Sequence, residues 1–485
     1  MFLEYQIERT DDFGPARRRI QARLADEGKS GKSGAAPRYR LTARPEHLGF
    51  RDQMSESLRN LLAVSPGPKS HPRLHARRLN WSVVCVALAL AAVSASAQEA
   101  IRASMAGQDA AEARKRAASE KFNVQLGPVS LRFQSTFEVE ANDNVRLEAD
   151  HPQADLIFRP QVNALSVWQV TEKNRLSLSL GVGYATYINT PEFDGLFLTP
   201  GSDLSFDVYV KDFVFNFHDR FSYIQDVSYD PTVSGIGSVN RFENVLGVSV
   251  SWDLNKAILG AGYDHATYLA TQQEFAFQSR ASELVNASAA FVVNPFTLAG
   301  IEIGAGVTDY DENVFNDNQH ASAGLFVSMR VSEYSSLRVS IGYVAFSFEP
   351  LSGTNQSLAS VSGLYGDLSW KQRVNAALSH SLSVGRSVQS GQFAEATELL
   401  YVRYDAQWRL FRQLGLGTSL SYEQFTETGG LGEEGSRWGF QVSLSRPWTR
   451  HLSSSLGYQL YLKASDAVNR DYLQNRLVFD LVYLF

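Results

Sequence analysis

Charged side chains recur on one face of alternating apolar runs, and they are the first residues in this sequence that could do chemistry. In residues 399–410, LLYVRYDAQWRL, Arg403 and Asp405 lie between bulky apolar residues at every second position. Such charges either select solutes electrostatically along a wet passage or pair across neighbouring strands into a solvated wall. Both interpretations are open for eight residues: Arg159, Asp207, Glu302, Arg330, Arg338, Arg403, Asp405 and Asp480.

Three tyrosines share the parity of these charges and offer a second kind of chemistry. Tyr209, Tyr401 and Tyr461 each fall on the polar side of an alternating run. An aromatic ring on a polar wall is suited to stacking on a sugar. It serves equally well as wall filler, and the sequence does not separate the two.

An acidic stretch at residues 309–317, DYDENVFND, spaces oxygen-bearing side chains in a way compatible with calcium. It lacks the central glycine and the terminal glutamate of an EF-hand loop, so we interpret it as a solvated acidic loop. We therefore expect neither a metal nor another cofactor. The weak candidate ligands are Asp309, Asp311, Asn313 and Asp317.

Nucleophilic or metal-assisted hydrolysis would need a histidine beside a hydroxyl, a carboxylate or a metal ligand. The histidines of the alternating runs are scattered, and neither a G-x-S-x-G nor an H-E-x-x-H motif occurs there. We therefore expect no enzyme. The histidines considered are His218, His265, His320, His380 and His451.

The elements that position all these residues are strands. Apolar residues recur with period two, as at Leu204, Phe206, Val208 and Val210, which fits a strand with one apolar face and no helix. Short connections such as KD and NP alternate with long ones such as SYDPTVSGIGSVN, which predicts an up-and-down antiparallel meander. Eighteen such runs cover residues 129–140, 155–168, 175–187, 203–210, 213–223, 243–254, 257–269, 280–292, 297–308, 320–332, 336–347, 357–370, 375–388, 398–411, 414–424, 437–447, 452–463 and 475–485.

These runs predict an all-β fold: one transmembrane antiparallel barrel of about 18 strands, with 16 as the alternative. A sandwich or soluble barrel would turn its apolar face inward, but a ring this wide cannot be filled with side chains. A propeller would show a blade repeat of roughly 40–50 residues, and we find none. Apolar faces directed at lipid leave the polar faces, with the eight charges and three tyrosines, in a wet lumen.

A secretory signal peptide is predicted at residues 75–97. Arg77 and Arg78 precede an apolar run, and the small residues Ala95 to Ala97 suit a cleavage site. The run also contains Cys85, the one cysteine of the chain.

The segments on either side of the signal peptide complete the domain plan. Residues 1–74 are basic and weakly periodic, and we interpret them as a mis-assigned or disordered leader. Residues 98–127 are predicted to be a short periplasmic helix or disordered, followed by the barrel at 128–485.

The charge balance differs between the two parts of the chain. Residues 1–97 hold 16 Lys and Arg against 9 Asp and Glu, which leaves 29 Lys and Arg against 42 Asp and Glu for the rest of the chain. This acidic balance argues against a nucleic-acid partner.

The last nine residues, LVFDLVYLF, resemble the C-terminal signature of bacterial outer-membrane barrels. That resemblance implies recognition by the barrel-assembly machinery, through Leu477, Phe479, Leu481, Tyr483 and the terminal Phe485.

Two further stretches resemble the putative β-barrel porin 2 family. They are FEVEANDNVRL at 137–147 and VTDYDENVF at 307–315. Members of that family often sit near exopolysaccharide export systems, which is what the resemblance adds to the functional alternatives.

We expect an outer-membrane, porin-like channel through which small hydrophilic solutes cross a polar lumen. One alternative is a conduit for exopolysaccharide export that works with periplasmic export partners, and another is a non-conducting surface barrel. The partners expected in every case are outer-membrane lipid and the barrel-assembly machinery.

Overall fold

The computed structural model describes residues 122–227, 230–351, 360–411, 413–430 and 432–485. The predicted leader and signal peptide lie outside these residues. In the described part of the chain, no helix is both long enough and apolar enough to cross a membrane. Of the segment 98–127, the described end contains a short strand, β1, where we expected a helix or disorder.

Nineteen strands are described, and most of their bounds follow the alternating runs within a few residues, but β5 begins eight residues before the run predicted at 203–210. The first ten are β1 (Val124–Leu126), β2 (Val129–Asn142), β3 (Asp155–Gln169), β4 (Arg175–Tyr187), β5 (Gly195–Val210), β6 (Phe213–Ile224), β7 (Arg241–Asp253), β8 (Ala257–Ala270), β9 (Arg280–Asn294) and β10 (Thr297–Tyr310). The others are β11 (Asn318–Ser332), β12 (Ser335–Phe348), β13 (Val361–Arg373), β14 (Leu378–Ser390), β15 (Ala396–Phe411), β16 (Leu414–Thr428), β17 (Glu434–Pro447), β18 (Leu452–Ser465) and β19 (Tyr472–Leu484). Two short 3-10 helices, η2 (Pro191–Phe193) and η3 (Gln273–Gln278), lie in connections.

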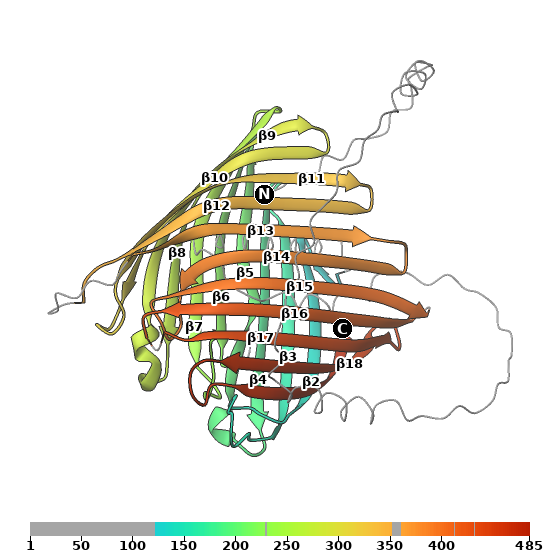
Figure 1. Ribbon diagram of the computed structural model, residues 1–485. Coiled ribbons are helices and arrows are strands. Elements are labelled where there is room, and N and C mark those ends of the chain that lie inside the picture. The colour runs from blue at the N-terminus through green and yellow to red at the C-terminus, as the bar shows by residue number, and fades with distance from the viewer. Residues whose placement is uncertain (1–121, 228–229, 352–359, 412, 431) are drawn as a thin grey trace, which may run out of the picture. The chain divides into compact units, whose positions relative to one another are not determined.

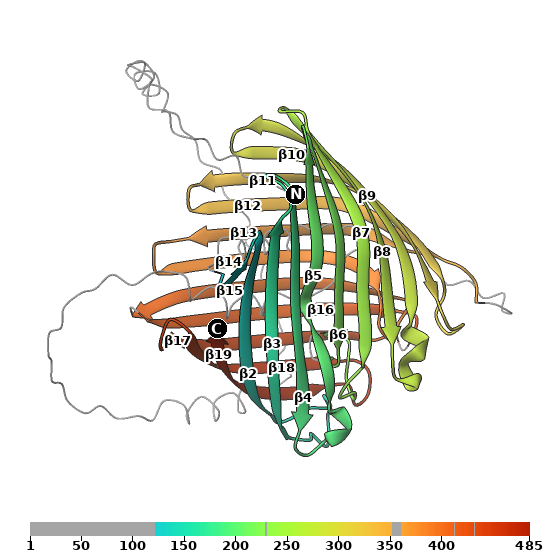
Figure 2. The same cartoon turned by 180° about the vertical axis from the view of Figure 1, so that it is seen from behind.

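Strands β2 to β19 form a closed antiparallel ring of 18 strands, which confirms the predicted fold class. Each pairs with its neighbours in sequence, and β19 closes the ring on β2 through pairs such as Leu477 with Ala141. Figure 1 views the ring from the side of β10 to β19, and Figure 2 from the side of β2 to β9. β1 forms a small hairpin with the start of β2.

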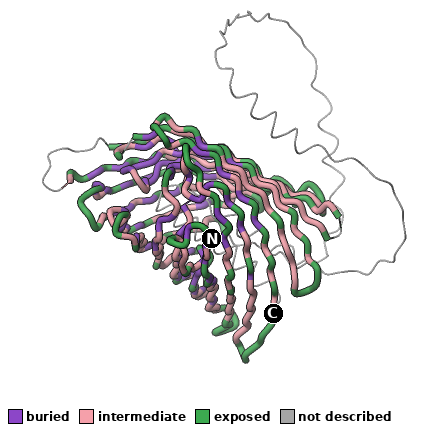
Figure 3. The backbone as a smooth tube through the Cα atoms, turned by 90° about the horizontal axis from the view of Figure 1, so that it is seen from below, coloured by how far each residue is buried: buried purple, intermediate pink, exposed green. Residues whose placement is uncertain are grey.

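The two faces of each strand differ as the period of two requires. Along β19, buried or half-buried residues alternate with exposed ones, and Phe485 at its end is 54 % exposed. Figure 3 shows buried and exposed residues mixed along the same strands in this way. The exposed face is apolar, and it carries large aromatic side chains beside the short turns: Trp168, Phe296, Tyr334, Trp408 and Trp448.

A polar clamp joins the first and last strands of the ring at its long-loop end. The Asp143 carboxylate accepts hydrogen bonds from the backbone N and side-chain Nδ2 of Asn475, at 2.6 and 2.5 Å. Asn144 donates from Nδ2 to the backbone oxygen of Leu473 at 3.0 Å, and Gln474 donates back to the Asn144 oxygen at 2.9 Å. Asp143 and Asn144 belong to the stretch 137–147, so their contacts in ring closure account for the Asn-Asp-Asn sequence in that stretch.

The inner side of the ring is partly apolar, which the sequence did not lead us to expect. β13 pairs with β14 only from Gly366 to Arg373. Beyond that point, the hairpin of β14 and β15 packs Val388 and Ala396 against Val344, Phe346 and Tyr365, in a buried cluster with residues of β12 and β13. The tip of this hairpin therefore leaves the line of the wall and turns inward.

Candidate functional site

Ion pairs run along the inner wall where the ring closes. Glu140, which is fully buried, accepts from Arg476 Nε at 2.8 Å and from Arg476 Nη2 at 2.7 Å. Arg159 bridges the same carboxylate and that of Glu138, each at 2.6 Å. Two arginines and two glutamates thus neutralise one another on β2, β3 and β19. The two-point contact of Arg476 also fixes the register of the closing strand.

Other strands of the inner wall carry further clusters of arginine and glutamate side chains. Arg437 lies 2.7 Å from the Glu423 carboxylate, and Arg403 lies 3.8 Å from the other oxygen of the same group. Glu302 accepts from Arg338 at 3.4 Å and from the Tyr365 hydroxyl at 3.3 Å. These contacts match the cross-strand pairing that the sequence left as one of its two alternatives.

The eight charged candidates are spread over the wall. Glu302 and Arg338 meet each other. Asp207 instead lies 3.4 Å from Arg175, and Asp480 accepts from the Ser455 hydroxyl at 2.7 Å. Arg330 is exposed near the turn end of β11, and Asp405 lies on the same face of β15 as Arg403, two residues further on.

All three tyrosine candidates make contacts within the structure. The Tyr401 hydroxyl donates to Asp367 at 2.8 Å, and the guanidinium of Arg437 lies 5.3 Å from the centre of the Tyr461 ring. Tyr209 is half-buried near the short turn after β5. Sugar stacking by these rings remains a prediction.

The acidic stretch at 309–317 begins at the end of β10, with Asp309 on that strand, and continues as the loop to β11. The Asp317 carboxylate accepts the backbone N–H of Tyr310 at 2.7 Å, so it closes the connection between β10 and β11. Among the described residues, no group of three or more His, Cys, Asp or Glu side chains is arranged to hold a metal ion. Asp309, Asp311, Asn313 and Asp317 therefore give no ligand set of that kind.

Long loops meet across the open end of the ring in an apolar cluster, here called the mouth cluster: Leu147, Val227, Val233, Val239 and Tyr472. Val233 and Val239 in the β6–β7 connection have no exposed surface. Gly235 in the same connection donates its N–H to the Leu147 oxygen at 2.9 Å. Because Leu147 follows β2 and Tyr472 begins β19, the β6–β7 connection reaches across several strands and lies over the mouth.

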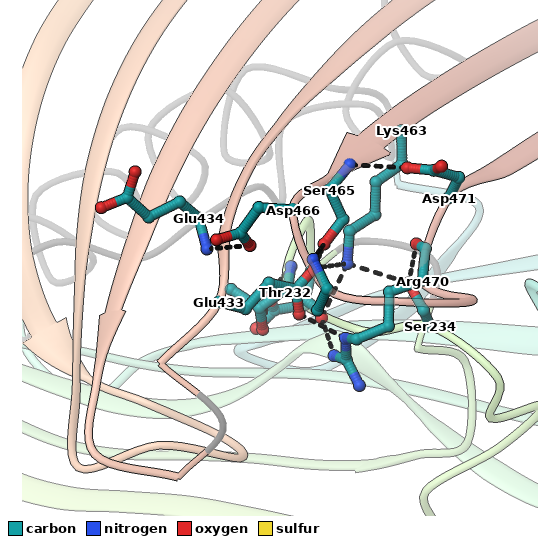
Figure 4. A network of polar contacts seen from close by, with 11 residues as sticks. Thr232, Ser234, Glu433, Glu434, Lys463, Ser465, Asp466, Arg470 and Asp471 are labelled. Atoms are coloured by element: carbon teal, nitrogen blue, oxygen red, sulfur yellow. Dashed lines mark hydrogen bonds and ion pairs between the residues drawn. The ribbon is translucent and has the colours of Figure 1, made fainter.

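A buried polar network also holds the β6–β7 connection in place, through residues of β18 and of the β16–β17 and β18–β19 connections (Figure 4). Lys463 on β18 donates to Thr232 O, Ser234 Oγ and Glu433 at 3.0, 2.8 and 2.8 Å. Arg470 also binds Glu433, and it donates from Nη2 to Thr232 O at 2.6 Å. One carboxylate and two cations thus tie the β16–β17 and β18–β19 connections to the loop that covers the mouth.

A second loop contact involves a carboxyl group with a shifted pKa. Glu395 in the β14–β15 connection is buried, and both of its oxygens accept the backbone N–H of Asn316, at 3.1 and 3.0 Å. Burial raises the pKa of Glu395 to about 7, with Asp317 adding to the shift and the Asn316 hydrogen bond opposing it. This contact can therefore change its charge near neutral pH.

Sequence reasoning missed the groups that shape the mouth. Glu433, Lys463 and Arg470 stand in unremarkable polar surroundings in the sequence. The three valines of the β6–β7 connection did carry a signal, because apolar residues in a long, Gly-rich loop need a buried surface. Glu140 and Arg476, 336 residues apart, had no local signal at all.

These features define a class of protein. A closed 18-strand barrel with an apolar outer face and a polar, ion-paired inner face is an integral outer-membrane β-barrel, since only closed barrels let strands cross lipid. No family model matches the chain, so the resemblance to the porin 2 family is not confirmed. No curated protein matches it either.

Solved outer-membrane channels are distantly similar in structure. OpdK of Pseudomonas aeruginosa with vanillate has a TM-score of 0.42 and 12 % identity, over 73 % of this chain and 99 % of that chain. OccK2 (OpdF) of the same species, in complex with glucuronate, has a TM-score of 0.44 and 10 % identity, over 73 % and 98 %. A BenF-like porin from Pseudomonas fluorescens has a TM-score of 0.44 and 10 % identity, over 74 % and 100 %. Likeness at this level transfers neither a family nor a solute to this chain.

Proposed function

We propose that this protein is a porin-like channel that lets small hydrophilic solutes cross the outer membrane. The observation that carries the proposal is the ion-paired polar inner wall of a closed 18-strand ring. Barrels of roughly 16–18 strands are wide enough to enclose an aqueous channel. Charged pairs on the inner face keep such a channel wet without giving it a strong net charge.

The mouth is the part of this channel that limits solute size. The β6–β7 connection covers it through the mouth cluster, and the Glu433 network fixes that connection in place. Small solutes pass beside this covered region, whereas larger ones need the connection to move. Of the two stretches behind the exopolysaccharide alternative, 137–147 contributes Asp143 and Asn144 to the clamp between β2 and β19, and 307–315 lies at the end of β10 and in the connection that follows.

Solute flux into liposomes tests the proposal. The full-length barrel is reconstituted, and swelling is measured with a graded series from monosaccharides to oligosaccharides. We expect flux of the smallest sugars through the native protein, and flux of larger ones after Val233→Ser with Val239→Ser, which weakens the mouth cluster. Val293→Ser changes an exposed valine near the short turn after β9 and is the matched control. A folded barrel that admits no sugar above protein-free liposomes, with or without the mouth variant, would refute the channel.

A further inference from the structure

Three side chains on neighbouring strands lie at one level of the inner face. Gln389 of β14 is paired with Thr397 of β15, and Thr397 is paired with Glu427 of β16. Directly opposed residues of antiparallel strands project to the same side, about 5 Å from their neighbour. Their oxygens therefore share one small region near the inward-turning hairpin.

All three side chains are more than nine-tenths buried. Their exposed fractions are 8 % for Gln389, 1 % for Thr397 and 4 % for Glu427. In the described structure, Gln389 Oε1, Thr397 Oγ1 and both carboxylate oxygens of Glu427 are buried without any hydrogen-bond partner. Four such oxygens on three successively paired residues are unusual, because buried polar atoms in folded proteins are nearly always satisfied.

Arg470 and Lys463 lie near enough to attract the Glu427 carboxylate, but neither donates a hydrogen bond to it. Lys463 directs its contacts at Glu433, Thr232 and Ser234, and Arg470 directs its contacts at Glu433 and Thr232. Glu427 is thus a buried carboxylate that forms no ion pair at contact distance, which is unfavourable unless further positive charge is supplied. Water can donate hydrogen bonds to these oxygens, but it brings no charge.

We propose that Gln389, Thr397 and Glu427 form a binding site for a hard divalent cation, with Ca²⁺ as the best fit. An amide oxygen, a hydroxyl oxygen and a carboxylate are ligand types that Ca²⁺ accepts, with water at the remaining positions. The site is independent of the acidic stretch at 309–317. A bound ion would join β14, β15 and β16 where the hairpin turns inward, and would stabilise the mouth.

Calcium titration of the purified full chain tests this proposal. After treatment with chelator, binding of CaCl₂ is followed by isothermal calorimetry in a non-ionic detergent, and the thermal midpoint of the barrel is measured in the same samples. With one carboxylate, we expect a single site with a dissociation constant of about 10⁻⁴–10⁻³ M. Glu427→Gln should weaken binding at least roughly tenfold, and Ca²⁺ should then no longer raise the midpoint.

Two further variants keep the test decisive. Thr397→Val removes a ligand oxygen with little change of shape and should also weaken binding, so it serves if Glu427→Gln does not fold. Asp405→Asn removes a carboxylate from the same inner wall, away from the site, and should leave calcium binding unchanged. The proposal is overturned if the native chain shows no saturable binding up to about 10 mM CaCl₂, or if both site variants bind as the native chain does. In that case a proton and water fill the site.

Discussion

Replacing Glu433 by Gln should release the loop that covers the mouth. Glu433 and Lys463 have no exposed side-chain surface, and Arg470 joins the same carboxylate. Gln keeps the shape and one acceptor but removes the charge. Lys463 and Arg470 then face each other with no anion between them.

The size of the effect follows from the burial of this network. Removing one partner of a buried ion pair costs about 3–5 kcal/mol, because a charge is left without compensation. At about 1.4 kcal/mol for each factor of ten, the equilibrium between the closed and the open loop should shift by roughly 10² to 4 × 10³-fold. The strand pairing of the ring is untouched in this variant, so the barrel itself should stay folded.

Hydrogen exchange measures that opening directly. The amides of Gly235 and Val239 are bonded to Leu147 O at 2.9 Å and Gln225 O at 3.1 Å, so their exchange reports on the β6–β7 connection. We expect much faster exchange there in Glu433→Gln, while the amides of β6 stay protected. Glu434→Gln is the control, since Glu434 is exposed and next in sequence. Unchanged exchange at Gly235 and Val239, or an equal effect of the control, would refute the assigned role of Glu433.

Three more predictions follow from other contacts. Asp143→Ala removes both hydrogen bonds to Asn475 and should lower the temperature at which the barrel loses its compact form in gel electrophoresis; an unchanged temperature would contradict the clamp. Leu147→Ala should loosen the mouth by about 2–4 kcal/mol, seen as larger solutes entering liposomes, and native size selection would count against the mouth cluster. The packing around Glu395 should become less stable as pH rises: its pKa is about 7 in the fold against 4.5 in the unfolded chain, so folding favours the protonated form, and between these values the cost of burying the ionised group outweighs its hydrogen bond from Asn316. Protection of the Asn316 amide against exchange should therefore be lower at pH 8 than at pH 5, which means exchange faster than the rate at pH 5 predicts. Glu395→Gln should abolish this loss of protection. The same loss of protection in Glu395→Gln would exclude Glu395 as its source.

The strands were predictable because their signal is local. Each of the eighteen runs shows its apolar face within a few residues, as at Leu400, Val402 and Tyr404, all of which are exposed on the barrel. Hairpin pairing then follows from chain order, because short turns join neighbours. Strand bounds differed where alternation was weak: β13 covers Val361–Arg373 where 357–370 was predicted, and β5 begins at Gly195 where 203 was predicted.

The contacts of the mouth were not predictable in the same way. Lys463 and Thr232 lie 231 residues apart, and they meet because a loop from β6 crosses the mouth to β18. The width of the ring and the tilt of its strands decide which loops can meet, and neither can be inferred from a local sequence pattern. The inward turn of the β14–β15 hairpin was missed for a related reason, since Val388 and Ala396 have the parity of lipid-facing residues and yet are buried.

The central claim is that the ring encloses a water-filled passage, and single-channel current through the purified, refolded barrel in a planar bilayer tests it most directly. We expect stable conductance steps whose ion selectivity shifts toward cations in Arg403→Glu, on the inner wall, and does not shift in Arg450→Glu, in an exposed turn. A folded barrel that inserts without any conductance, or an ion selectivity that is unchanged in Arg403→Glu, would contradict the presence of a water-filled passage lined by Arg403.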